Sequence, residues 1–213
     1  MRRHARARRY VLRVSGGVIH LTIPTRGSSK AADRWLRTKT DYVEKRLAET
    51  PDPVPFRFGS VLPVLGQDRL VRPVERGRAR MTLDALLIPE GSPEQVDRAV
   101  RRLVRAACLD AARRDLFIYW SALGVEPRDT RVRDMKTLWG RCAQDGATVL
   151  NTRLAFAPRE VFSAVAAHEA AHRIVMDHGP EFQETVRRLM PDYDRHDRWL
   201  RENGHGLFAY GAT

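Results

Sequence analysis

Alternating apolar and polar residues predict β-strands in the first ninety residues. Tyr10–Val14 and Val18–Ile23 alternate with period two on either side of a glycine-containing turn, which predicts a β-hairpin. Apolar residues recur again between Gly-rich and Arg-rich turns, so three further short strands are expected at Val61–Leu65, Leu70–Val74 and Met81–Ile88.

Two segments with apolar residues at helical spacing are expected to form helices, one between these strands and one after them. Ser28–Thr50 carries apolar side chains at helical intervals and stops before a Pro-Asp-Pro run, so it predicts a helix. A second helix is expected to start at Ser92, because Gln95 stands in capping-box register with it. It continues to Leu123, with Gly124 as a plausible C-cap.

The remaining chain repeats this mixture in a different order. Thr130–Met135 and Ala147–Leu154 are expected strands, Arg159–Met176 is an expected helix with a broad apolar surface, and two shorter helices follow. Strands and helices in this order predict an α+β fold. It divides into an N-terminal part of antiparallel strands and helices (residues 1–91) and a second part (residues 92–213), which could also form one compact unit.

The run His-Glu-Ala-Ala-His at residues 168–172 lies in the expected helix Arg159–Met176. His168 and His172 are four positions apart, so their imidazoles lie on one helical face, about 5–6 Å apart. His178 follows in a Gly-Pro turn, where a side chain can fold back toward the helix. Three histidines with one open coordination position are typical of catalytic zinc, whereas the alternative is a helix with surface histidines.

Glu169 follows the first histidine directly, so its carboxylate projects beside the expected metal rather than onto it. A carboxylate in that place can take a proton from zinc-bound water, which makes Glu169 the candidate general base. The sequence therefore predicts a zinc-dependent hydrolase.

The segments around these residues resemble the YgjP-like zinc metallopeptidases, a group of the minigluzincin or SprT-like type. The resemblance rests on four blocks in the same order, with weaker likeness reaching back to Val11. It implies a zincin-like second part, a zinc cofactor and a polypeptide substrate. Leu138 and Arg141 depart from the arginine and serine usual in the family. The four blocks are Arg133–Cys142, Leu150–Leu154, the residues from His168 to Phe182, and Pro191–Asp194 with Arg198–Leu200.

Four other residues are candidates for the site. Tyr193 and His196 are possible donors to a developing oxyanion, the alternatives being a buried ring and a surface histidine. Asn151 would bind substrate if Ala147–Leu154 were an edge strand, but it could equally satisfy a neighbouring turn. Trp139 is either a wall of the cleft or a core anchor.

The chain is strongly basic, with 38 Lys and Arg against 26 Asp and Glu. The first fifty residues hold thirteen of these basic residues and four of the acidic ones, so weak binding of nucleic acid through this part is possible. Arginine outnumbers lysine heavily, however, and a GC-rich genome explains such a composition without any function. No apolar run approaches the about 20 residues needed to cross a bilayer, and two cysteines do not make a disulfide framework. A cytoplasmic enzyme is expected.

Two alternatives to a peptidase stay open. The same zinc site could hydrolyse nucleoside triphosphates as a pyrophosphohydrolase, an activity also associated with the family, whose charged substrates would suit the arginines. A non-enzymatic alternative is a basic nucleic-acid-binding module with a structural zinc. Structural zinc sites usually have four protein ligands, which argues against the latter.

Overall fold

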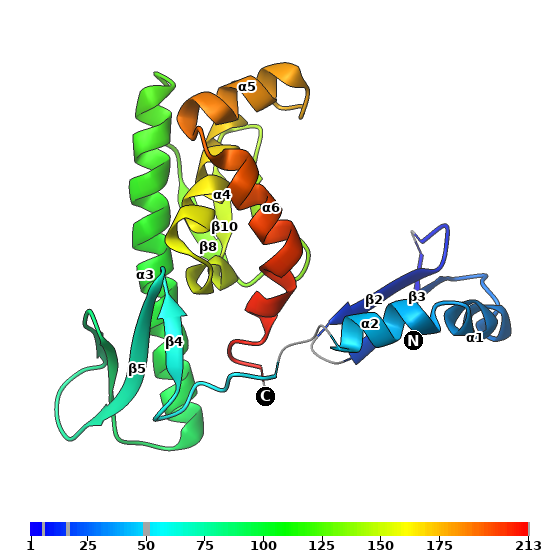
Figure 1. Cartoon of the computed structure of the whole chain (residues 1–213), viewed down its shortest axis with the longest axis horizontal. Helices are drawn as coiled ribbons and strands as arrows, with labels where there is room; N and C mark the ends of the chain where they lie inside the picture. The colour runs from blue at the N-terminus through cyan, green and yellow to red at the C-terminus, as the bar shows by residue number, and fades with distance from the viewer. Residues whose placement is uncertain (6, 16–17, 49–51, 213) are drawn as a thin grey trace.

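The computed structural model describes residues 1–5, 7–15, 18–48 and 52–212. Figure 1 shows a small N-terminal unit beside a larger part that is built around one long helix. Helices and small mixed sheets occur in both, so the predicted α+β class is confirmed. Within the described residues, no helix combines the length and the apolar character that crossing a membrane requires.

The N-terminal unit is a three-stranded sheet followed by two short helices (Figure 1). Its antiparallel pair confirms the predicted hairpin, with Leu12 opposite Leu21, although Gly16 and Gly17 of the turn lie outside the described residues. A parallel strand at the N-terminus was not predicted. The elements are β1 (Arg2–His4), β2 (Val11–Ser15), β3 (Val18–Pro24), α1 (Ser29–Arg37) and α2 (Thr40–Ala48), and the sheet order is β1-β3-β2.

The single helix expected over Ser28–Thr50 is wrong, because the chain breaks at Thr38. The hydroxyl of Thr38 donates to the carbonyl of Trp35 at 2.7 Å, and that of Thr40 donates to the carbonyl of Arg37 at 2.7 Å. Threonine hydroxyls that bond to nearby carbonyls compete with the helical pattern, which explains the break.

A four-stranded sheet opens the larger part. The three predicted strands are present, but Met81–Ile88 forms two strands separated by a turn in which the hydroxyl of Thr82 donates to Asp84 at 2.9 Å. Leu65 and Gly66 have positive φ angles of 54° and 80°, which is the conformation of a tight hairpin turn. The strands are β4 (Val61–Val64), β5 (Gln67–Val74), β6 (Arg80–Met81) and β7 (Ala85–Pro89), in the order β4-β5-β7-β6.

The long helix α3 (Pro93–Ala122) packs against this sheet, against a second small sheet and against the helix that carries the histidines. Ser92 and Gln95 form the predicted capping box, and Gly124 adopts a φ of 66° just after the helix end. Side chains of β4, β5 and β7 share one hydrophobic core with α3, whereas Leu21, Ile23 and Ala32 form a separate cluster in the N-terminal unit. The strands β4, β5 and β7 thus pack with α3, and the division expected after residue 91 stays a prediction.

The second sheet lies beside the helix with the histidines. Its order is β8-β10-β9, so β10 is the central strand and β9 lies at one edge. The expectation that Ala147–Leu154 is an edge strand is therefore wrong. The elements of this region are β8 (Thr130–Arg133), β9 (Gly140–Cys142), β10 (Thr148–Asn151), η1 (Thr152–Phe156), α4 (Arg159–Ala171), α5 (Pro180–Leu189), α6 (Tyr193–Asn203) and η2 (Gly204–Phe208).

Candidate metal centre

Three histidines from two adjoining segments converge at the end of α4. His168 lies in the last turn of the helix, His172 is its C-cap, and His178 lies on the loop before α5. Their ring centroids are 4.8 to 5.1 Å apart, and Nε2 of His168 lies 3.2 Å from Nε2 of His178. His168 and His172 are half-buried while His178 is exposed, so the cluster opens to solvent on one side.

Because α4 ends at Ala171, the chain can turn back and place His178 beside His168 and His172. The helix stops at Ala171 rather than at the expected Met176, and the backbone N–H groups of Ile174 and Val175 bond to the carbonyl of Ala171. Asp177 then accepts a hydrogen bond from the N–H of Gly179 at 2.8 Å, just before α5 begins at Pro180. The compact turn leaves only a short loop between His172 and His178.

The ring of Phe182 packs against all three histidines. It is fully buried, and its ring centroid lies 4.8 Å from that of His168, 4.6 Å from that of His172 and 4.8 Å from that of His178. The apolar ring therefore restricts all three imidazoles at once. This contact could not be predicted from the sequence, because a phenylalanine in an amphipathic helix is expected in the core in any case.

Hydrogen bonds orient two of the imidazoles toward a common point. Nδ1 of His172 lies 3.0 Å from the carbonyl of Val175, and a carbonyl can only accept, so the proton resides on Nδ1 and Nε2 keeps its lone pair. Nδ1 of His168 lies 2.8 Å from the hydroxyl of Tyr193. Metal-binding histidines commonly use their other ring nitrogen in this way.

These residues fit a zinc ion. Two nitrogens that each lie about 2.0–2.1 Å from a tetrahedral metal are roughly 3.3 Å apart, close to the separation between His168 and His178. Burial, together with His172 and His178, lowers the pKa of His168 to about 4. Burial and His178 also lower the pKa of His172. The neutral, metal-binding form of both rings is thereby favoured.

Glu169 is buried beside strand β9. Its side chain is only 4 % exposed, and burial raises its pKa to about 8, while a backbone hydrogen bond from Cys142 lowers it in part. Strand β9 lies directly against it, because a Cβ atom at Gly140 would overlap Oε1 of Glu169. The carboxyl group is thus placed between the metal-binding helix and the edge of the second sheet.

A cavity of about 200 Å³ adjoins Glu169 and His168. Trp139 lines it and packs against Phe208 with ring centroids 5.6 Å apart, so this indole is both a cavity wall and part of the packed interior. Tyr193 and His196, from α6, also line the cavity. Three of the four additional candidates therefore lie beside the histidine cluster.

Asn151 is the candidate that the structure places elsewhere. It is fully buried, and its Nδ2 donates to the carbonyls of Met135 and Leu138 at 2.7 and 2.8 Å. Its Oδ1 accepts from the backbone N–H groups of Met135 and Arg153. Every polar atom of the amide is used to hold neighbouring backbone, which favours the structural alternative over substrate binding.

The sequence matches the model of a known protein family. The model described as YgjP-like, metallopeptidase domain, covers residues 8–203. The chain belongs to the YgjP-like family. Searches of curated proteins and of solved structures found no match. A metallopeptidase domain supports a hydrolase that uses a metal, and the three histidines of this YgjP-like chain form a group that could hold one.

The two departures from the family's usual residues lie on the surface. Leu138 is 51 % exposed, and Arg141 is exposed within β9. Neither belongs to the histidine cluster. Leu138 precedes β9 by two residues and Arg141 lies within it, and the metal-binding histidines of this YgjP-like chain are unchanged.

Proposed function

We propose that this protein is a zinc-dependent peptidase that uses His168, His172 and His178 as ligands and Glu169 as general base. The observation that carries the proposal is the convergence of three imidazoles at 4.8 to 5.1 Å between ring centroids, with a buried carboxyl group on the next residue. A zinc ion bound there would polarise the substrate carbonyl and the attacking water.

Glu169 would supply the proton transfer. A zinc ion beside Glu169 would offset the effect of burial on its pKa by favouring the carboxylate, which can take a proton from water and then donate it to the leaving amine. Because Glu169 is buried beside β9, a peptide bound along that strand would lie close to its carboxyl group.

Strand β9 is the proposed binding edge for an extended substrate. The carbonyl of Trp139 accepts from Asn151, and the N–H of Ala143 donates to Ala147, so these two residues face β10. Neighbouring residues of a strand direct their backbone groups to opposite sides, which turns Gly140 and Cys142 away from β10, where the N–H of Cys142 already donates to Glu169. Backbone groups at such an edge can pair with a peptide by strand addition.

Tyr193 and His196 take different roles in this proposal. The hydroxyl of Tyr193 bonds to His168, so Tyr193 acts as a positioning residue for a ligand. His196 lines the cavity and remains the candidate donor to the developing oxyanion.

Nucleotide hydrolysis and a structural zinc are less well supported as functions of this site. Among its described lining residues, the cavity beside Glu169 has no arginine or lysine to neutralise a triphosphate. Within the described part of the chain, the cluster comprises three histidines and no fourth Cys, Asp or Glu, as an open catalytic site requires.

The test compares zinc-loaded protein with Glu169→Gln on an unfolded protein, on peptide libraries and on a panel of nucleoside triphosphates. We expect peptide cleavage that chelator abolishes, that added zinc restores, and that the variant lacks. A loss of about 10²–10⁴-fold is expected if proton transfer is the main role of Glu169. Glu169-dependent release of phosphate or pyrophosphate without peptide cleavage would replace the proposal with nucleotide hydrolysis.

A further inference from the structure

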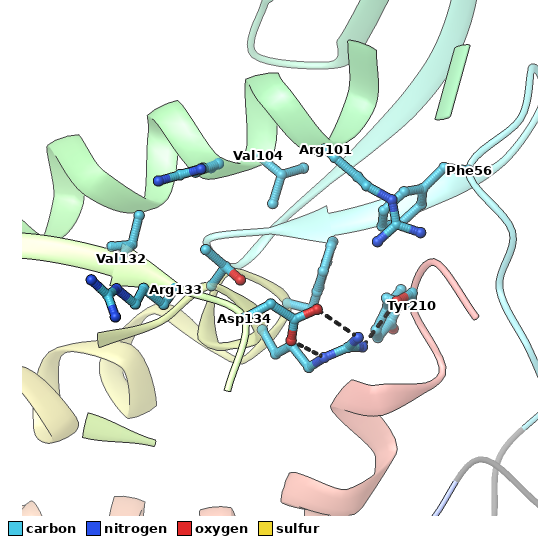
Figure 2. Close-up of a pocket in the computed structure, with 11 residues that line it drawn as sticks. Phe56, Arg101, Val104, Val132, Arg133, Asp134 and Tyr210 are labelled. Atoms are coloured by element: carbon cyan, nitrogen blue, oxygen red, sulfur yellow. Dashed lines mark hydrogen bonds and ion pairs between the residues drawn. The ribbon is translucent and has the colours of Figure 1, made fainter. Parts of the chain in front are cut away.

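A second cavity, of about 290 Å³, lies between α3, β8, η1 and the C-terminal segment. Its apolar lining comes from Val104 and Val132 and from three aromatic rings, those of Phe56, Phe156 and Tyr210 (Figure 2). It shares no lining residue with the cavity beside Glu169. The two cavities are therefore distinct in space.

Two arginines of this cavity are already neutralised and serve as parts of its wall. Arg101 binds Asp97 at 2.7 and 3.0 Å and lies over the ring of Phe56. Arg153 binds Asp134 at 2.8 and 3.0 Å and also donates to the carbonyl of Tyr210. Dashed lines mark the bonds to Asp134 in Figure 2. These bonds fix the walls, so the cavity is preformed.

Two further arginines line the same cavity with their charges free. Arg105 comes from α3 and Arg133 from the end of β8, and both side chains are exposed. Among the described residues, neither has a recorded ion pair or hydrogen bond. Asp134, the one acidic residue among the described lining residues, is occupied by Arg153. The cavity thus presents two unpaired guanidinium groups beside an apolar, aromatic interior, which complements an anion with an apolar body.

The volume of the cavity and its guanidinium donors indicate which class of ligand it can bind. Small-molecule pockets usually have volumes of about 300–1,000 Å³, so this cavity suits a small ligand. Guanidinium groups bind phosphate oxygens in a planar, two-pronged arrangement, and flat rings pack well against aromatic walls. Phe156 and Tyr210 are already stacked, with centroids 4.5 Å apart, and present such a wall.

We propose that this cavity binds a phosphate monoester with a flat aromatic body, the chemistry of a nucleoside monophosphate, either free or at the end of a nucleic-acid strand. Arg105 and Arg133 hold the phosphate, and the ring occupies the apolar interior. The site is independent of the peptidase activity proposed above.

The experiment titrates zinc-loaded protein with adenosine 5′-monophosphate by calorimetry and compares Arg105→Ala/Arg133→Ala with a matched pair. The control is Arg113→Ala/Arg131→Ala, which removes two arginines from the same helix and the same strand, outside the cavity lining. We expect the first pair to weaken binding at least about tenfold and the control to leave it nearly unchanged. Both variants should retain the wild-type melting temperature and peptide turnover.

Comparison ligands define the chemistry of the site. Adenosine and inorganic phosphate should each bind at least about tenfold more weakly than the monophosphate, since each supplies half of the contacts. Tighter binding of a 5′-phosphorylated tetranucleotide would identify the end of a strand as the source. The proposal is overturned by equal binding to wild type and to Arg105→Ala/Arg133→Ala, by phosphate binding as well as the nucleotide, or by no binding at millimolar nucleotide. Tighter binding of an apolar tripeptide with a free carboxylate would also overturn it.

Discussion

The hydroxyl of Tyr193 lies 2.8 Å from Nδ1 of His168, on the opposite side of the imidazole from the nitrogen that faces His178. Tyr193 is 6 % exposed, and burial raises the pKa of its phenol, so the hydroxyl keeps its proton at neutral pH. The ring nitrogen that bonds to Tyr193 determines which nitrogen of His168 is free to bind a metal.

Replacing Tyr193 by phenylalanine should therefore weaken zinc binding. Partners of this kind commonly change metal affinity about 10- to 100-fold, and we expect a loss in that range for Tyr193→Phe. Competition with a chromophoric chelator measures it. Unchanged zinc affinity combined with a large fall in turnover would instead make Tyr193 a donor to the oxyanion.

The third ligand can be tested by His178→Ala. Because only two imidazoles of the cluster would remain, we expect zinc content after dialysis to fall from about one per chain to well below it. His20→Ala is the matched control, since His20 is exposed in the N-terminal unit and should not alter zinc content. Stoichiometric, tightly held zinc in His178→Ala would remove His178 from the ligand set.

The buried carboxyl group of Glu169 predicts a pH-dependent stability of the metal-free protein. Its pKa is raised from 4.5 to about 8 on folding, so the folded chain binds more protons than the unfolded chain between these values. The contribution of Glu169 to stability is thus complete below about pH 4.5 and is lost as the pH rises to about 8.

Chelator-treated Glu169→Gln should accordingly become more stable relative to wild type as the pH rises. His168 has the opposite behaviour, because its pKa is lowered from 6.5 to about 4 and its contribution is lost as the pH falls through that range. Melting temperatures measured between pH 6.5 and 9 therefore isolate Glu169. A constant difference between the two proteins across this window would contradict the raised pKa.

A nearly buried ion pair secures the helix that carries the metal-binding pair. Arg159, at the start of α4, binds both carboxylate oxygens of Asp115 on α3, and Asp115 is 4 % exposed. Asp115→Ala leaves the guanidinium without its partner, and because the Arg159 side chain is 32 % exposed and stays partly solvated, we expect destabilisation by about 1–3 kcal/mol in urea unfolding. Asp129→Ala, which breaks the exposed pair with Arg131, should cost less than about 1 kcal/mol. Equal effects of the two substitutions would show that burial does not strengthen the first pair.

Weak binding of polyanions by the N-terminal unit remains a prediction. Arg8 and Arg9 are exposed and line a shallow hollow with Tyr10 and Trp35, a suitable place for phosphate contacts. Titration with single- and double-stranded DNA should show binding that weakens steeply with salt and that Arg8→Ala/Arg9→Ala reduces. No binding at low salt would leave composition alone as the explanation of the charge.

Sequence reasoning succeeded where local spacing determines the structure. The four-residue interval between His168 and His172 predicts their proximity because it is one helical turn, and the capping box at Ser92 depends only on residues three apart. Each of these features depends on neighbours along the chain.

The features that were missed depend on contacts between distant segments. The three-residue strand β9 has too few residues to show alternation, and only its pairing with β10 makes it an edge. For Asn151 the sequence offered a contact with a neighbouring turn as an alternative, but not the particular partners, because Met135 and Leu138 lie more than ten residues earlier. Local patterns do not specify which strand will be central in a sheet.

The close approach of β9 to Glu169 has a consequence for reading mutational data. Any side chain at Gly140 would occupy the space of the carboxyl group, so even alanine would displace the proposed base. If every residue type were tested at position 140, all replacements of Gly140 would lose activity, and the position would look like that of a catalytic residue. The cause would be steric, because only glycine leaves room for the carboxyl group of Glu169. Adding small carboxylates or imidazole would therefore not restore activity to these variants.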